Sequence, residues 1–120
     1  MFGKKDNSFP TSPTTFDTLV GRNAKFTGNL ESAGLVRIEG NVTGDIKIEG
    51  NLVIGKDSVV VGNIKATNVE IYGSVNGNIN VEDSLTLYET ATVSGDVEIK
   101  NLVVKENANF AGNCKTKVNA

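Results

Sequence analysis

The residues that could carry out chemistry in this chain are its carboxylates, its lysines and one cysteine. The sequence of 120 residues has 14 Asp and Glu residues and no histidine. Histidine is the commonest general base and a common zinc ligand, so its absence excludes catalytic triads and metal sites that depend on imidazole. Most of the carboxylates lie in alternating stretches such as Lys47-Ile48-Glu49 and Val97-Glu98-Ile99, a pattern typical of the solvent face of a strand. We therefore expect no catalytic residue, no metal site and no enzyme activity.

The basic residues favour neither a nucleotide nor a nucleic acid as a ligand. Gly55-Lys56 lacks the upstream glycine and the following Ser or Thr of a phosphate-binding loop. The net charge is −2 and the isoelectric point is about 5.1, whereas nucleic-acid-binding domains carry a basic patch. The sequence therefore predicts no cofactor, no nucleotide and no nucleic-acid partner.

Cellular location is constrained by the cysteine and by the apolar runs. Cys114 has no partner for an internal disulfide, which fits a reducing compartment. No apolar run approaches the roughly 18–20 residues that span a bilayer, and Met1-Phe2-Gly3 is too short for a secretory signal. We expect a cytoplasmic protein.

The elements that would position these residues begin after a distinct N-terminal segment. Residues 1–22 hold both prolines of the chain and the polar run DNSFPTSPTT, which predicts a disordered tail. From Ala24 onward there is no proline, and Val, Ile, Asn and Gly dominate. Because proline cannot donate to a β ladder, this composition favours strands and turns throughout the rest of the chain.

An internal repeat sets the predicted architecture. The stretch VRIEGNVTGDIKI (36–48) is echoed by VEIYGSVNGNINV (69–81), 33 positions later. Apolar residues recur every six positions in three runs that restart after a gap of three. The runs are Val36, Val42, Ile48, Ile54, Val60 and Ala66; Val69, Val75, Val81, Leu87, Val93 and Ile99; and Leu102, Ala108 and Cys114. This phase places Cys114 at a core position, where we expect a small buried side chain.

Glycines mark the length of each coil. Six of them, Gly28, Gly44, Gly62, Gly77, Gly95 and Gly112, are spaced by 16, 18, 15, 18 and 17 residues and are each followed by Asn or Asp. A strand followed by a sharp corner makes one side of a polygon, and three sides make a coil of about 17 residues. The sequence predicts an all-β, single-stranded triangular β-helix of five to six coils, with Asn ladders along its edges. An all-β sandwich is the alternative fold, but it would not keep a six-residue phase over this length.

The segments IEGNVTGDI (38–46), VVGNIKATNVEIYGSVNGNI (60–79) and VSGDVEIKNLVV (93–104), together with the short leader, resemble the bactofilin family. The resemblance implies a right-handed β-helix core, placed at residues 23–114, between the 1–22 tail and a short C-terminal tail at 115–120. It also implies a bacterial cytoskeletal protein that polymerises without nucleotide and associates with the inner face of the cell membrane. Its self-assembled filament would scaffold cell-shape or envelope proteins.

The predicted coil has two ends with unpaired backbone groups, and neither end has an evident cap. We expect such ends to stack on one another. The candidate contact residues are Phe110, Val104, Ala108 and Val118 near the C-terminus, and Phe26 and Leu30 near the N-terminus. Phe110 is the strongest candidate, since aromatic residues often anchor interfaces; alternatively, it only fills the last coil.

The leader Met1-Phe2-Gly3-Lys4-Lys5 resembles the membrane-targeting peptides of the family. Met1 and Phe2 would insert into the lipid, and Lys4 and Lys5 would contact anionic headgroups. Alternatively, it is an ordinary chain start followed by a linker.

Two other functions remain as alternatives. A solenoid that binds a ligand without polymerising would need a regular face of Thr or aromatic residues, which Thr43, Thr67, Thr86, Thr90 and Thr92 do not form. A hexapeptide-repeat acyltransferase would need a histidine base, which is missing.

Overall fold

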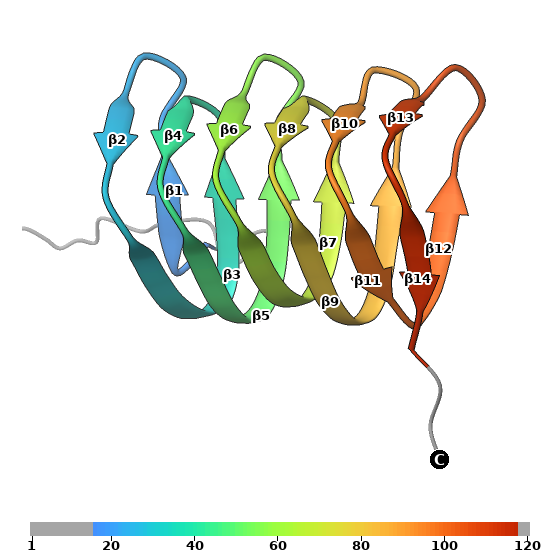
Figure 1. Cartoon of the computed structure of the whole chain (residues 1–120). Coiled ribbons are helices and arrows are strands. Elements are labelled where there is room, and N and C mark those ends of the chain that lie inside the picture. Colours follow the sequence, from blue (N-terminus) through green and yellow to red (C-terminus); the bar gives the residue numbers. More distant parts are fainter. Residues whose placement is uncertain (1–15, 118–120) are drawn as a thin grey trace, which may run out of the picture.

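The structure is a computed structural model that describes residues 16–117 (Figure 1). All regular structure in this range is β-strand. The strands are β1 (Thr18–Val20), β2 (Lys25–Thr27), β3 (Leu30–Ile38), β4 (Asn41–Thr43), β5 (Ile46–Ile54), β6 (Val59–Val61), β7 (Ile64–Ile71), β8 (Ser74–Asn76), β9 (Ile79–Leu87), β10 (Thr92–Ser94), β11 (Val97–Ile99), β12 (Asn101–Val104), β13 (Asn109–Ala111) and β14 (Cys114–Thr116).

The strands form a parallel β-solenoid of six coils with three sides. One side is the sheet of six short strands in the order β13-β10-β8-β6-β4-β2. The other two sides belong to one eight-stranded sheet, because β3, β5, β7 and β9 each bend at a corner in mid-strand. The bends coincide with the positive φ of Gly34 (+82°) and Gly50 (+154°) and with register shifts after Lys47 and Ala66. The predicted fold class and coil length are therefore confirmed.

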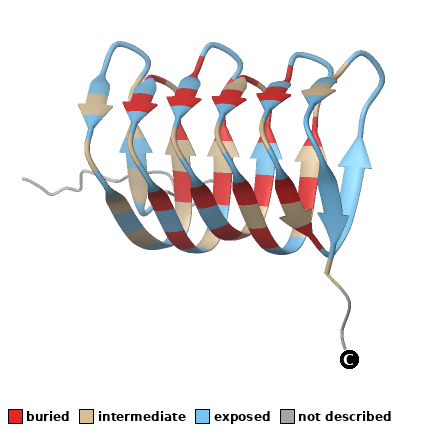
Figure 2. Ribbon diagram, in the orientation of Figure 1, coloured by how far each residue is buried: buried red, intermediate tan, exposed pale blue. Residues whose placement is uncertain are grey.

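The core consists of columns of side chains that run along the solenoid axis (Figure 2). In each sheet, residues with the same orientation stack on their counterparts one coil away. Two of the columns are Phe26, Val42, Val60, Val75, Val93 and Phe110, and Leu30, Ile46, Ile64, Ile79, Val97 and Cys114. Every member of the six-residue series from Val36 to Ile99 is at most 3% exposed. The periodicity thus predicted the core of the four inner coils.

A column of glycines turns one corner of the triangle. The six glycines that set the coil length all have φ between +134° and +152°. A Cβ at Gly62, Gly77 or Gly95 would overlap the carbonyl oxygen of the glycine one coil earlier. Only glycine combines this backbone conformation with so close an approach, so each coil depends on it.

A ladder of Asn and Asp follows the glycine column. The side-chain Oδ1 of each member accepts a hydrogen bond from the backbone N–H of the next, at 3.1–3.4 Å. The members are Asn29, Asp45, Asn63, Asn78, Asp96 and Asn113. The sequence predicts edge ladders of Asn41, Asn51, Asn63, Asn78 and Asn113. Of these, Asn63, Asn78 and Asn113 belong to this ladder. Asn51 instead accepts from Asn68 Nδ2 (3.0 Å) on another edge, and Asn41 lies on β4.

The strands extend beyond the limits that the sequence predicts for the core. Thr18–Val20, expected in the tail of residues 1–22, pairs with Val36–Ile38 as β1. At the other end β14 continues to Thr116, past the predicted limit at residue 114. A strand of three residues after a polar, proline-containing run carries too little periodicity to stand out in the sequence.

The prediction that Cys114 is buried is wrong, because its side chain is exposed. Cys114 does lie on a core column, directly over Val97. Its exposure has a simple physical reason: among residues 16–117 no further coil follows to cover it. The six-residue phase predicts correctly that the Cys114 side chain has a core orientation. It cannot predict whether a further coil covers that side chain.

Candidate functional site

The two open ends of the solenoid are the candidate functional site. At the N-terminal end the sheets finish at β1 and β2, and at the C-terminal end they finish at β12, β13 and β14. Each terminal strand pairs on one side only within residues 16–117. Such edges present N–H and C=O groups that can pair with further strands.

The C-terminal end exposes side chains that would be core in any inner coil. Leu102 and Val104 lie over Leu85 and Leu87, which are 0% and 1% exposed, but are themselves 38% and 49% exposed. Figure 2 shows the same contrast, since β12 and β14 are pale blue whereas the preceding coils carry red segments. This end is therefore an apolar surface of core composition left open to solvent.

The N-terminal end is a smaller version of the same surface. Phe26, Leu30 and Val20 pack against the core from one side and are partly exposed on the other. They begin the columns that Phe110, Cys114 and Val104 end. Both surfaces thus derive from the same columns of the coil.

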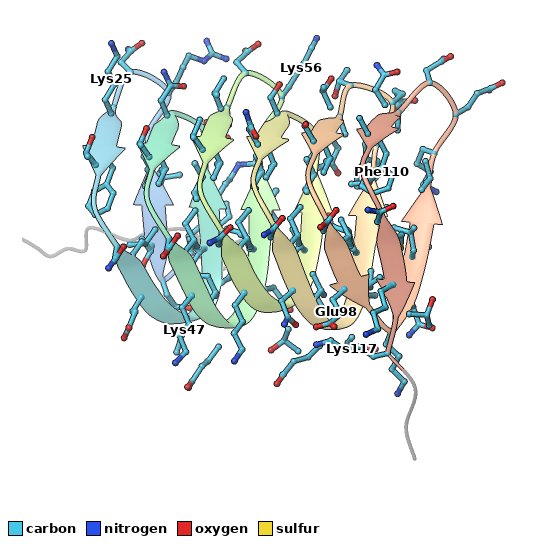
Figure 3. The ribbon with its side chains drawn as sticks, in the orientation of Figure 1. Lys25, Lys47, Lys56, Glu98, Phe110 and Lys117 are labelled. Atoms are coloured by element: carbon cyan, nitrogen blue, oxygen red, sulfur yellow. The ribbon has the colours of Figure 1, made fainter. Side chains whose placement is uncertain are left out.

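An aromatic ring lies at each end of one column. Phe26 pairs with Val42 and Phe110 pairs with Val93, so both rings extend the line of valines in the six-stranded sheet. Phe110 packs against the buried core and remains partly exposed in the last coil (Figure 3). Where inner coils use valine, the terminal coils place a larger side chain with more apolar area to bury.

The corner glycine of the last described coil has no backbone acceptor one coil later. Within the solenoid each corner glycine donates its N–H to a carbonyl one coil later, as Gly28 does to Thr43 O and Gly95 to Ala111 O, both at 2.9 Å. Gly112 holds this place in the last described coil, where no later coil supplies an acceptor. The edges therefore keep unused hydrogen-bonding capacity that a neighbouring strand could satisfy.

Several of the residues predicted for the site are placed by the structure and others are not. Phe110, Val104 and Ala108 lie together at the C-terminal end, and Phe26 and Leu30 lie at the N-terminal end. Val118 and the leader residues Met1, Phe2, Lys4 and Lys5 fall outside the described residues. Leu102 and Cys114 also belong to the C-terminal surface, and their six-residue phase with Ala108 was the signal that could have assigned them.

The described residues contain little that resembles a catalytic or metal centre. In residues 16–117 no group of three or more His, Cys, Asp or Glu side chains could hold a metal ion. Tyr72 and Tyr88 stack with ring centroids 4.1 Å apart, and burial together with the hydrogen-bonded neighbour Tyr88 raises the pKa of Tyr72 to about 12. A phenol with that pKa is a poor acid or base near neutral pH.

A groove follows the Asn/Asp ladder along the solenoid axis. Its volume is about 570 Å³, and it runs between the ladder and the outward side chains of Lys47, Lys65 and Glu98. The groove is shallow and repeats with each coil. In the described part of the chain, no helix is long and apolar enough to cross a membrane.

A parallel β-solenoid whose core columns and sheet edges are open at both ends belongs to the class of proteins that can grow by adding coils. A family model described as "Bactofilin: Polymer-forming cytoskeletal" matches residues 18–115. The chain therefore belongs to the bactofilin family, and it is a polymer-forming cytoskeletal protein.

A solved structure supports the same assignment. The chain is similar to a bactofilin of Thermus thermophilus, seen in a cryo-EM reconstruction of double helical filaments. The two share 30% sequence identity and a TM-score of 0.80 over 83% of this chain and 99% of the other. A comparison with curated proteins finds no match.

Proposed function

We propose that this bactofilin assembles end to end into filaments, without nucleotide, through the two open ends of its solenoid. The observation that carries the proposal is the exposure of core columns at both ends, with Phe26 and Phe110 at the ends of one column. Stacking two ends would bury these side chains and pair the free sheet edges. Neither step needs an energy source from nucleotide hydrolysis.

The gain from stacking is large enough to compete with the cost of association. Completing the burial of one half-exposed Val, Leu or Phe contributes about 1 kcal/mol. Leu102, Val104 and Phe110 supply three such side chains at one end alone, and the edge strands add several hydrogen bonds of about 1 kcal/mol each. Association itself costs about 4–15 kcal/mol, so the apolar surface at the ends is needed for a stable contact.

Electron microscopy of the purified full chain in the absence of nucleotide tests the proposal. We expect filaments from the wild type and dispersed subunits from a Phe110→Arg variant, because the charge would have to be desolvated in the contact. Thr67→Arg, which adds the same charge at a partly exposed position of an inner coil, is the control and should form normal filaments.

Two results would contradict this assignment at different levels. Discrete wild-type subunits at high protein concentration would refute filament formation. Normal filaments from Phe110→Arg would refute the role of the end surface while leaving filament formation intact.

We further propose that the filament lies in the cytoplasm on the inner face of the membrane and scaffolds cell-shape or envelope proteins. The leader supports this role: burying Met1 and Phe2 would contribute about 3–5 kcal/mol, and Lys4 and Lys5 about 1 kcal/mol each near anionic lipid. One copy would bind weakly, but a filament with many copies would bind firmly through avidity.

Co-sedimentation with anionic vesicles tests the membrane role. The full chain should pellet with the vesicles, and a chain lacking residues 2–5 should remain in solution although it still forms filaments. Equal binding by both chains would rule out the leader as the membrane contact.

A further inference from the structure

The outer face of the six-stranded sheet differs in charge from the other sides of the solenoid. Its outward side chains come two from each of the strands β2, β4, β6, β8, β10 and β13. They are Lys25, Thr27, Asn41, Thr43, Val59, Val61, Ser74, Asn76, Thr92, Ser94, Asn109 and Ala111. Only Lys25 is charged, and it lies on the terminal strand (Figure 3). We call these residues the neutral face.

The centre of the neutral face is apolar. Val59 and Val61 are 42% and 44% exposed on β6, a middle strand of the sheet. Thr43 and Asn76 flank Val61 on the adjacent strands. All of these side chains are short, so the centre of the face is free of the long charged groups that keep a sheet surface in water.

The neighbouring side carries outward charges on its inner strands. Lys47, Lys65 and Glu98 project outward from β5, β7 and β11 on the neighbouring side. The turns beside the neutral face, such as the one with Lys56, are also charged and would form a polar rim (Figure 3). An uncharged centre inside a polar rim is the composition of a protein–protein interface.

We propose that the neutral face joins this filament laterally to a second filament of the same chain. The proposal rests on the filament proposed above. The similar Thermus thermophilus bactofilin was reconstructed as double helical filaments, so two filaments of such subunits can lie side by side. A second copy of this chain is the occupant that fits a flat, neutral face repeated along a filament, because the repeat of one filament matches that of the other.

The size of the face explains why pairing would follow polymerisation. Six strands about 4.8 Å apart and three residues long at about 3.3 Å each give roughly 300 Å² per subunit. A stable interface buries about 800 Å² per partner, so two free subunits would not pair. About three subunits in a row reach that area, and a filament sums many weak contacts. Lateral pairing is therefore a property of the filament and not of the subunit.

The test compares filament pairing in variants of the full chain by negative-stain electron microscopy without nucleotide. Val59→Lys with Val61→Lys places charge at the centre of the neutral face. We expect single filaments, with the paired fraction of filament length reduced at least about tenfold, because every subunit carries the change. Val53→Lys with Thr86→Lys places the same charges on outward positions of inner strands on another side and should leave pairing unchanged.

A second variant tests whether loss of pairing results from misfolding and not from the added charge. Thr43→Lys with Asn76→Lys changes two exposed polar positions beside Val61, where the core is not involved, and should also give single filaments. Circular dichroism should show unchanged strand content for each variant.

The contradicting outcomes separate this proposal from the one on which it rests. If the wild-type chain forms no filaments, the proposed function is refuted, and lateral pairing of filaments is refuted with it. Filaments that stay paired in both neutral-face variants, or wild-type filaments that are single, would refute the lateral contact alone. If filaments of the neutral-face variants stay paired but no longer bind anionic vesicles, the neutral face would be assigned to the membrane. This result would also overturn the lateral contact.

Discussion

Replacing Gly77 by alanine should unfold or severely destabilise the solenoid. Gly77 lies in the corner column with φ of +152°, a conformation that L residues rarely adopt. An added Cβ would overlap the carbonyl oxygen of Gly62 and lie 2.6 Å from its carbonyl carbon. Neither backbone can move freely, because Gly62 N–H and Gly77 N–H both donate to the following coil, at 3.0 and 2.9 Å.

The magnitude follows from these two effects. The backbone conformation alone costs about 1–3 kcal/mol for a non-glycine residue, and the steric overlap adds to it. We expect a loss of at least about 3 kcal/mol, a large share of the roughly 5–15 kcal/mol of a typical domain. With a urea slope of about 1–3 kcal/mol per molar, the unfolding midpoint should fall by at least about 1 M.

Gly55→Ala is the matched control. An added Cβ at Gly55 would lie 3.4 Å from Glu39 Cγ and from Ile38 O, which is ordinary contact, and its φ is not in the left-handed region. Its stability should change by less than about 1 kcal/mol. Urea unfolding followed by circular dichroism measures both variants at a concentration where light scattering detects no filaments. A Gly77→Ala midpoint equal to that of Gly55→Ala would refute the reasoning.

Two further predictions concern single side chains. Ser58 is 1% exposed and donates from Oγ to Gly40 O at 2.7 Å, so Ser58→Ala should lower the free energy of unfolding by about 1 kcal/mol; no change in the urea midpoint would show that water replaces the bond. Burial and Tyr88 raise the pKa of Tyr72 from 10.0 to about 12, so its neutral form stabilises the fold below pH 10 and this contribution is lost as the pH rises toward 12. Near-ultraviolet phenolate titration should detect a late-ionising tyrosine that is absent in Tyr72→Phe. A wild-type curve without this late step would contradict the burial.

The inner coils could be predicted from the sequence because their periodicity reports a repeated environment. Val42, Val60 and Val75 have similar apolar neighbours in the coils before and after them, so their spacings of 18 and 15 residues give their orientation. The corner glycines Gly62 and Gly77 were likewise predictable, since only glycine fits the positive φ.

The terminal coils could not be predicted as well, because their environment is not repeated. Thr18–Val20 is too short a strand to distinguish from the tail before it, and Cys114 follows the core phase without being covered. The neutral face was also missed, because outward residues such as Asn41, Val59 and Ser74 share only the absence of charge. That property becomes visible once β4, β6 and β8 are placed side by side.

The central claim, that the open ends are the contacts of the filament, can be tested most directly with the native cysteine. Cys114 is the only cysteine of the chain, and it is exposed on a core column at the C-terminal end. A maleimide should label its thiol rapidly in dispersed Phe110→Arg subunits. In wild-type filaments labelling should be confined to the few subunits at filament tips. Complete labelling at the same rate in intact filaments would contradict the account.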